Sequence, residues 1–279
     1  MHTAEIVRRA AAYLDRHDVD SPLPTAELLL MSVLGTDRTG LYRGGRELSR
    51  AEARRFGRAL CRRCSGIPTQ HLTGEQGFRR LVLEVRVDVF VPRPETEVLV
   101  DVALQLIEDR EAPTIVDVGT GSGAIALAIK QERPDARVLA TDLSPEAVGL
   151  AGANAERLGL DVDVIQGDLL DPIPSHLRGA VDLVVSNPPY VNHDEYTELP
   201  IDVRAEPRLS LIGGIEIYER LFTAAAGWVR QRHGAVAVEM GESMGHAVSE
   251  AAAIAGFTGP VAIVPDLTGR PRVLRARRP

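Results

Sequence analysis

The sequence contains few cysteines, few aromatic residues and no long apolar run. Its two cysteines, Cys61 and Cys64, are too few for a disulfide framework or a complete thiolate zinc site. They flank two arginines within a helical pattern, so we interpret them as ordinary helix residues rather than a redox pair. Aromatic residues make up only 4% of the chain, which argues against a base-stacking platform for single-stranded nucleic acid.

Membrane and metal-binding signals are also missing. No stretch approaches the roughly 20 apolar residues of a membrane span, and residues 1–12 lack the basic-then-apolar pattern of a signal peptide. These absences predict a cytoplasmic protein with no membrane partner. Histidines, cysteines and acidic residues do not recur at metal-ligand spacing, so we expect no bound metal.

The charge is divided unevenly along the 279 residues. Residues 1–85 hold 14 arginines and 10 acidic residues, whereas the rest of the chain holds 18 basic and 29 acidic residues. Such an asymmetry indicates two regions with different partners. The length likewise predicts about two domains, or one large α/β domain with an appendage.

The first third of the chain is predicted to differ in structure from the rest. Residues 1–65 show apolar positions at helical spacing, and Ser49 with Glu52 forms a capping-box pattern, so a small all-helical domain is expected. Residues 66–90 are predicted to be a β-hairpin linker, because apolar and charged residues alternate over positions 81–89.

Residues 91–279 show alternating strand and helix patterns. Strands are expected at 114–118, 137–141, 162–165, 181–185, 235–239, 261–264 and 272–274. Helices are expected at 95–108, 124–130, 145–158 and 218–230. Strands separated by helices predict an α/β domain with a parallel sheet covered on both faces.

A glycine-rich turn follows the first of these strands. Gly119, Gly121 and Gly123 sit where the backbone of a doubly wound sheet approaches a ligand, since glycine avoids a Cβ clash. The spacing is neither the dinucleotide fingerprint nor a phosphate loop. Asp142 ends the next strand at roughly the 20-residue distance expected of a carboxylate that binds ribose hydroxyls. Asp168 ends the third strand and is a candidate acceptor for an adenine amino group.

Each of these signals is weak alone, because an isolated Asp more often caps a helix or turn. Together and in this order, they resemble the motifs of S-adenosylmethionine-dependent methyltransferases, which implies a Rossmann-like sheet of seven strands.

A second motif, Asn187-Pro188-Pro189-Tyr190, follows the fourth strand. Taken alone it is equally well a turn. Its residue types suit methylation of an NH₂ group, whose nitrogen is a poor nucleophile. The Asn187 side-chain oxygen and the Pro188 carbonyl can accept its two N–H bonds. The prolines restrict the backbone so that this carbonyl is already aimed, and the Tyr190 ring can pack on a planar acceptor. We therefore predict that these four residues are catalytic, with adenine N6, cytosine N4 and a glutamine amide all open as acceptors.

Sequence outside these two motifs narrows the choice of methyl acceptor. The segments that carry the resemblance are Gly66 to Pro68, Leu72 to Glu75, Phe78, Phe90 to Glu97, Asn187 to Val191 and Glu206 to Leu211. They resemble the peptide chain release factor glutamine methyltransferases, and the similarity covers nearly the whole chain. The resemblance implies a class I methyltransferase domain preceded by a helical substrate-recognition domain. It implies methyl transfer from S-adenosylmethionine to the glutamine N5 of the Gly-Gly-Gln loop of class I release factors, with S-adenosylhomocysteine as product.

The resemblance also implies roles for individual residues. Cofactor binding is expected at Asp117, Gly119, Thr120, Gly121, Ser122, Gly123, Asp142, Asp168, Leu169 and Asn187. Glutamine binding is expected at Asn187, Pro188, Pro189, Tyr190, Phe90 and Arg93.

Three alternatives differ in substrate or in class. The first is a nucleic-acid adenine-N6 or cytosine-N4 methyltransferase, which would need a basic recognition region; the catalytic part is instead acidic, so no nucleic-acid substrate is expected. The second is a ribosomal protein glutamine methyltransferase, which shares the Asn-Pro-Pro-Tyr motif but differs after Pro92-Arg93. The third is a non-catalytic adaptor, in which one of the two motifs would be broken.

Overall fold

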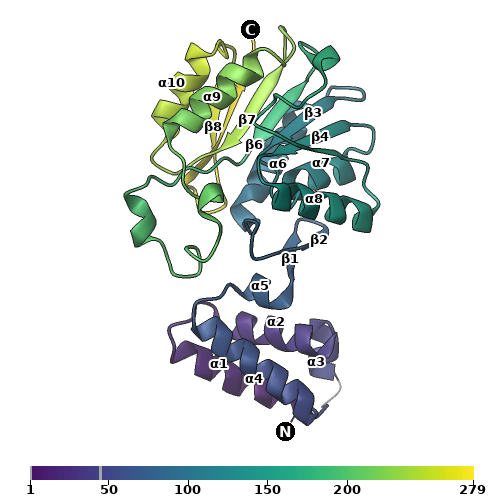
Figure 1. Ribbon diagram of the computed structural model, residues 1–279, viewed down its shortest axis with the longest axis vertical. Coiled ribbons are helices and arrows are strands. Elements are labelled where there is room, and N and C mark those ends of the chain that lie inside the picture. Colours follow the sequence, from purple (N-terminus) through teal and green to yellow (C-terminus); the bar gives the residue numbers. More distant parts are fainter. Residues whose placement is uncertain (1, 44–45) are drawn as a thin grey trace. The chain divides into compact units, whose positions relative to one another are not determined.

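The computed structural model describes residues 2–43 and 46–279, which divide into two compact units (Figure 1). The first unit comprises the chain up to Glu75 together with Pro200–Ala205, and the second comprises Gln76–Leu199 and Glu206–Pro279. Among the described residues, no helix combines the length and the apolar character that crossing a bilayer requires.

The first unit is helical, as predicted. Its helices are α1 (Thr3–Asp15), α2 (Pro22–Leu34), α3 (Arg38–Arg43), α4 (Arg50–Cys64) and α5 (Thr69–Thr73). The capping box is confirmed: the Ser49 hydroxyl accepts from the Glu52 N–H, and the Glu52 carboxylate accepts from the Ser49 N–H at 2.8 Å. The segment Pro200–Ala205 packs in the same unit, where Arg63 Nη2 lies 3.1 Å from the Asp202 carboxylate.

The structure differs from the sequence prediction between residues 66 and 90. Only β1 (Glu75–Phe78) and β2 (Leu81–Glu84) form the two-stranded sheet, and residues 69–73 form α5 instead. The alternation over 81–89 does not continue as a strand, because the chain turns where the Val89 N–H donates to the Arg86 carbonyl at 3.2 Å. The first unit therefore extends to Glu75 rather than to residue 65.

The second unit contains the predicted sheet of seven strands, in the order β5-β4-β3-β6-β7-β9-β8. Its strands are β3 (Thr114–Val118), β4 (Arg137–Asp142), β5 (Asp163–Gln166), β6 (Leu183–Ser186), β7 (Ala235–Glu239), β8 (Val261–Pro265) and β9 (Pro271–Arg277). The first five are parallel, but β9 runs antiparallel to both β7 and β8. The predicted parallel sheet is confirmed for these five strands, whereas β9 departs from it because the five residues between β8 and β9 are too few for a parallel crossover.

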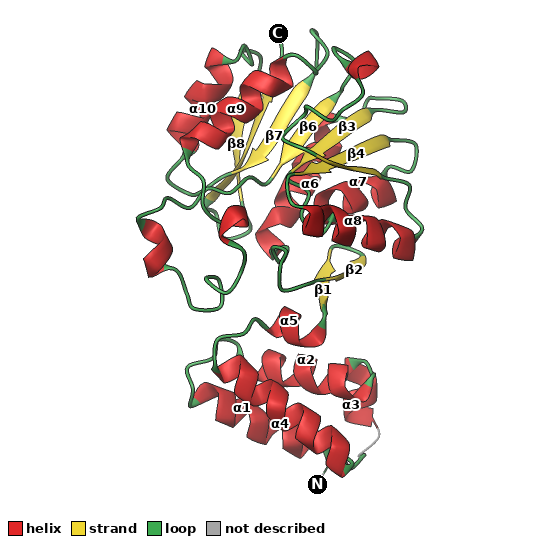
Figure 2. Cartoon of the chain, in the orientation of Figure 1, coloured by secondary structure: helices red, strands yellow, loops and turns green. Residues whose placement is uncertain are grey.

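Helices cover both faces of this sheet (Figure 2). They are η1 (Pro94–Thr96), α6 (Glu97–Leu106), α7 (Ala124–Glu132), α8 (Pro145–Leu158), α9 (Ile215–Ala226) and α10 (Gly245–Ile254), with further 3₁₀ turns η2 (Ser175–Leu177), η3 (Glu195–Glu198) and η4 (Arg208–Ser210). Side chains of α6, α7 and α8 form one apolar core against the sheet, and those of α9 and α10 form a second core on the other face. The buried central strands are thus apolar on both sides.

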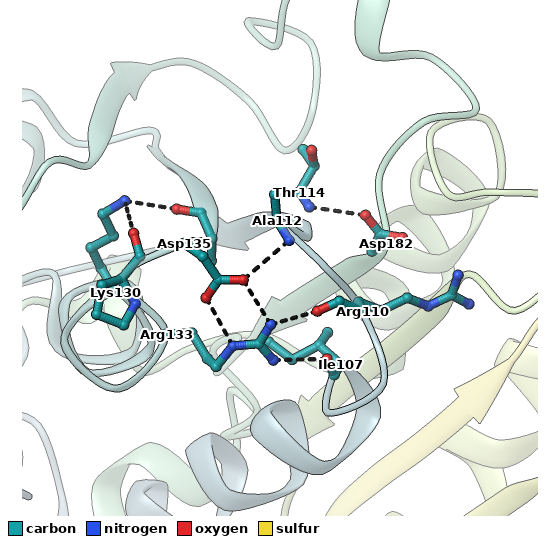
Figure 3. Close-up of polar contacts among 10 residues, drawn as sticks. Ile107, Arg110, Ala112, Thr114, Lys130, Arg133, Asp135 and Asp182 are labelled. Atoms are coloured by element: carbon teal, nitrogen blue, oxygen red, sulfur yellow. Dashed lines mark hydrogen bonds and ion pairs between the residues drawn. The ribbon is translucent and has the colours of Figure 1, made fainter.

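Polar contacts fix the amino ends of the central strands (Figure 3). Arg133 donates to the carbonyls of Ile107 and Arg110, at 2.8 and 2.6 Å, and pairs with Asp135. The buried Asp182 carboxylate accepts the first N–H of β3, from Thr114, at 2.9 Å. Side chains thus hold the amino edge of the sheet in place. The candidate site lies in the loops at the opposite, carboxyl edge.

Candidate active site

Apart from Phe90 and Arg93, the predicted site residues lie at or just after the ends of β3, β4, β5 and β6, which are neighbours in the sheet. These four strands are parallel, so their carboxyl ends meet at one edge. Ser186 at the end of β6 donates a buried hydrogen bond to the Val118 carbonyl at the end of β3, at 2.7 Å. The glycine-rich turn and the Asn-Pro-Pro-Tyr segment are therefore tied together by the strands that precede them.

The glycine-rich turn is held by backbone hydrogen bonds to β4. The N–H groups of Gly119 and Thr120 donate to the Thr141 carbonyl at 2.8 and 3.0 Å. Gly119, Gly121 and Gly123 all have positive φ, and at Gly123 a Cβ would also lie 2.9 Å from the Leu127 side chain. The backbone conformation thus favours glycine at all three positions, and the packing of α7 favours it at Gly123 as well.

Asp117 lies beneath this turn with no exposed surface. Its carboxylate accepts hydrogen bonds from the Thr120 hydroxyl at 2.6 Å and from the Ala126 N–H at 3.2 Å. Burial raises the pKa of Asp117 to about 7. The side chains of Thr120 and Ser122 are buried as well. In the described structure, Asp117, Thr120 and Ser122 therefore lie beneath the turn, and Asp117 holds it to the start of α7.

The raised pKa of Asp117 predicts a pH dependence of stability. The folded state binds the Asp117 proton more tightly than the unfolded state, so this group makes the free energy of unfolding fall as pH rises from about 4 to 7. The slope is at most about 1.4 kcal/mol per pH unit. Denaturant unfolding at pH 5 and pH 7 is expected to show a smaller pH difference for Asp117→Asn than for the unmodified chain. Equal differences in the two proteins would contradict the prediction.

Asp142 connects the turn to the start of α8. One carboxylate oxygen accepts from the Gly121 N–H and the other from the Ser144 N–H, both at 2.9 Å. Partial burial raises its pKa. Leu143, the next residue, is 54% exposed although it is apolar. The sequence analysis did not include Leu143 among the candidate site residues. The feature that could have drawn attention to it is a large apolar side chain immediately after a strand-end aspartate.

Asp168 and Leu169 lie at the end of β5 beside α9. They line an open cleft of about 440 Å³ together with Asp171, Arg220 and Thr223. The Asp168 carboxylate forms an ion pair with Arg220 at 2.6 Å. Leu169 adopts a left-handed conformation with φ 48°, and its carbonyl accepts from the buried Thr141 hydroxyl at 2.7 Å. Thr141 thereby holds Leu169 at the same edge as the glycine-rich turn.

The Asn-Pro-Pro-Tyr segment leaves β6 and is packed closely by the chain around Gly213. The Val191 N–H donates to the Leu211 carbonyl, and the Gly213 N–H donates to the Val191 carbonyl, both at 3.0 Å. A Cβ on Gly213 would lie 1.9 Å from the Pro189 carbonyl oxygen. The backbone of Gly213 is therefore in direct contact with the segment that carries the predicted acceptor groups.

The Asn187 side chain is oriented by a residue that the sequence did not single out. Its Nδ2 donates to the Thr96 hydroxyl at 3.2 Å. Tyr190 is half-buried beside Gly241, and burial together with the nearby Glu239 carboxylate raises its pKa. Thr96 and Glu239 lie about 90 and 50 residues from Asn187 in the chain, so only the fold brings them to the site.

Phe90 and Arg93 lie together just before η1 in the second unit. The Arg93 guanidinium stands 5.1 Å from the centre of the Phe90 ring, and its Nη2 lies 2.6 Å from the carboxylate of Glu206, whose side chain is fully buried. This ion pair joins two of the segments that carried the sequence resemblance. Among residues 2–43 and 46–279, no three or more His, Cys, Asp or Glu side chains gather as a metal site.

The chain is similar in sequence to known families and proteins. Residues 5–74 match the family model described as PrmC N-terminal domain, and residues 95–202 match the methyltransferase small domain. The release factor glutamine methyltransferase of Moorella thermoacetica is 43% identical, covering 98% of this chain and 96% of that protein. The protein of the same name from Deinococcus radiodurans is 41% identical, covering 100% and 99%.

Solved structures support the fold. The hMettl16 catalytic domain superposes with a TM-score of 0.57 at 16% identity, covering 79% of this chain and 81% of that one. A human methyltransferase 10 domain containing protein gives a TM-score of 0.52 at 17% identity, covering 70% and 87%. At these identities the likeness concerns the fold alone, and it confirms the predicted Rossmann-like fold.

Proposed function

The chain belongs to the release factor glutamine methyltransferase family, and from this premise we propose its reaction in atomic terms. The proposed enzyme transfers a methyl group from S-adenosylmethionine to the side-chain amide N5 of the glutamine in the Gly-Gly-Gln loop of class I release factors. The amide nitrogen loses one N–H proton to solvent as it gains the methyl group, and S-adenosylhomocysteine is the second product. A substrate that belongs to the translation machinery supports a cytoplasmic location for this reaction.

The observation that carries the proposal is the orientation of Asn187. Because its Nδ2 is occupied by Thr96, its Oδ1 is the end that can accept an N–H from a substrate amide. The Pro188 carbonyl on the same rigid segment is the second acceptor. Together they would hold both N–H bonds of a glutamine NH₂ group and turn its nitrogen toward the methyl donor.

The residues at the strand ends fit S-adenosylmethionine. Asp142 has carboxylate lone pairs beyond those that accept backbone N–H groups, which suits ribose hydroxyls. The exposed Leu143 and the half-buried Leu169 offer apolar surface for an adenine ring. The glycine-rich backbone allows the remainder of the molecule to approach closely. When bound, S-adenosylmethionine supplies an electrophilic methyl group on a sulfonium.

The assay that tests this reaction offers three substrates in parallel. The protein is incubated with labelled S-adenosylmethionine and either a release factor, a ribosomal protein preparation or DNA, and mass spectrometry locates the label. Label on the glutamine of the Gly-Gly-Gln loop is the expected result. Label only on ribosomal protein or only on DNA bases would replace this proposal with one of the two rival acceptors.

The helical unit is proposed to dock the release factor through basic side chains. Arg54, Arg55 and Arg58 are exposed on α4. Changing all three to Glu is expected to raise the KM for intact release factor about tenfold, because charges at the rim of an interface mainly affect association. The affinity for S-adenosylmethionine should stay unchanged.

A matched variant separates position from total charge. The exposed Arg8, Arg9 and Arg16 belong to the α1 region of the same unit, and changing them to Glu alters the net charge equally. Steady-state kinetics with intact release factor should show the larger KM change in the α4 variant. Equal KM values for both variants would mean that the α4 arginines are an ordinary solvated face.

A further inference from the structure

The short 3₁₀ turn η1 carries a polar side chain at each of its ends. Arg93 directly precedes the turn and Thr96 is its last residue. The Thr96 N–H donates to the Arg93 carbonyl at 3.1 Å, and the ring of Pro94 fixes its own φ within the turn. The side chains of Arg93 and Thr96 are therefore held at a fixed spacing on one small piece of backbone.

These two side chains contact different parts of the chain between β6 and α9. At its start, Asn187 Nδ2 donates to the Thr96 hydroxyl at 3.2 Å. On its returning part, the Glu206 carboxylate lies 2.6 Å from Arg93 Nη2, and the Glu206 side chain has no exposed surface. The Arg93 guanidinium also stands 5.1 Å from the centre of the Phe90 ring, which restricts it further.

Backbone hydrogen bonds join the outgoing and returning parts of the same stretch. The Val191 N–H donates to the Leu211 carbonyl, and the Gly213 N–H donates to the Val191 carbonyl, both at 3.0 Å. The Asn-Pro-Pro-Tyr segment is thus held at its first residue by η1 and just beyond its last residue by the returning chain. Because Glu206 ties that returning chain to η1, the contacts form a closed circuit around the segment.

The buried ion pair in this circuit is better explained by position than by stability. Burying a carboxylate is costly, and apolar residues of similar volume often replace a buried ion pair without loss of stability. An ion pair nevertheless requires a defined direction and distance, which apolar packing does not. The Arg93–Glu206 pair therefore fixes where the returning chain lies relative to η1.

We propose that Arg93 and Glu206 are positioning residues that complete a clamp on the Asn-Pro-Pro-Tyr segment. The η1 clamp consists of Arg93–Thr96 with its links to Asn187 and Glu206. This inference rests on the proposed function and deepens it. The clamp holds the Asn187 side chain and the Pro188 carbonyl at the spacing that two N–H bonds of one NH₂ group require. In this role Arg93 and Glu206 act through the segment and need not touch the substrate.

Two substitutions of Glu206 test the clamp. Glu206→Leu keeps a similar volume and removes the carboxylate, and water can still reach Arg93, whose side chain is 30% exposed. We expect kcat to fall on the order of 100-fold, as for a reacting group misplaced by about 1 Å, with little change in KM for S-adenosylmethionine. Glu206→Gln, which keeps an acceptor oxygen for Arg93, should recover most of the loss. Unchanged kcat in Glu206→Leu would overturn the proposal.

Arg230→Leu is the matched control for general destabilisation. Arg230 Nε lies 2.8 Å from the carboxylate of Asp182, which is buried at the amino edge of the sheet. Breaking this ion pair should lower the thermal stability and leave kcat unchanged at a temperature where the variants are folded. A loss of kcat as large as that of Glu206→Leu would attribute both losses to destabilisation and overturn the clamp.

A double-mutant cycle tests whether the two links act as one device. Thr96→Val removes the hydroxyl that contacts Asn187 and opens the circuit at its other link. Once the circuit is open, breaking the second link removes less constraint, so the double variant should lose clearly less than the product of the two single losses in kcat. Losses that multiply would show that the two links act independently, and the clamp would be wrong.

A readout without release factor separates this inference from the proposed function. The side-chain amide ¹⁵N resonance of Asn187, assigned by its absence in Asn187→Ala, should shift in Glu206→Leu and stay in place in Arg230→Leu. An Asn187 resonance that Glu206→Leu leaves unmoved overturns the clamp, whichever substrate is methylated. Failure to label release factor, with this shift present, would instead overturn the proposed substrate and support the clamp.

Discussion

Replacing Asn187 by alanine is expected to lower the rate of methyl transfer by about 10²–10³-fold, the usual cost of removing one preorganised hydrogen-bonding group from a reacting centre. The variant removes the Oδ1 acceptor that holds the substrate amide, whereas the glycine-rich turn and Asp142 are untouched. Binding of S-adenosylmethionine, measured by isothermal titration calorimetry, should therefore change little. Single-turnover rates with release factor measure the loss directly.

Asn192→Ala provides the matched control. Asn192 is exposed, and its side chain bonds to Glu195, three residues further along the chain, at 3.2 Å. Its removal should leave the single-turnover rate close to that of the unmodified enzyme. If Asn187→Ala lost cofactor affinity and transfer rate in parallel, Asn187 would be chiefly a cofactor ligand and its assignment as the amide acceptor would be wrong.

Local patterns predicted the elements that carry the site because each signal is confined to a few neighbouring residues. The strand Thr114–Val118 and the helix Pro145–Leu158 were predicted with the bounds that the structure shows. The strand β3 is buried on both faces and is mainly apolar, through Ile115, Val116 and Val118, and Ser144 caps α8 through the Ala147 N–H. Neighbouring parallel strands then bring the residues after them to one edge.

Features that depend on distant contacts were not predictable in this way. The antiparallel direction of β9 follows from the short connection after β8, which the strand patterns did not weigh, and α10 was missed. Asp117 was expected to bind the cofactor, and its burial under the turn depends on the packing of α7. Thr96 stands within the Phe90–Glu97 segment that carried the resemblance, but nothing in that segment indicates that its hydroxyl contacts Asn187.

Gly213→Ala is expected to reduce kcat on the order of 100-fold, because displacing reacting groups by about 1 Å has that effect. The added Cβ would stand 1.9 Å from the Pro189 carbonyl oxygen and 2.7 Å from the carbonyl carbon, so one of the two backbones must move. Pro189 directly follows the carbonyl of Pro188 that accepts the second N–H. Any shift of Pro189 therefore re-aims both acceptors, although neither Asn187 nor Pro188 has been altered.

The next residue offers the control that isolates this contact. At Gly214 the backbone is extended, with φ 168°, and an added Cβ would meet the flexible end of the Glu216 side chain at 2.5 Å. That carboxylate can rotate away, so Gly214→Ala should keep kcat within a few-fold of the unmodified enzyme. Thermal unfolding of both variants distinguishes a displaced segment from general destabilisation. Equal kcat for the two variants would show that the loop around Gly213 does not position the Asn-Pro-Pro-Tyr segment, and that Ser186 and the strand ends suffice to hold it.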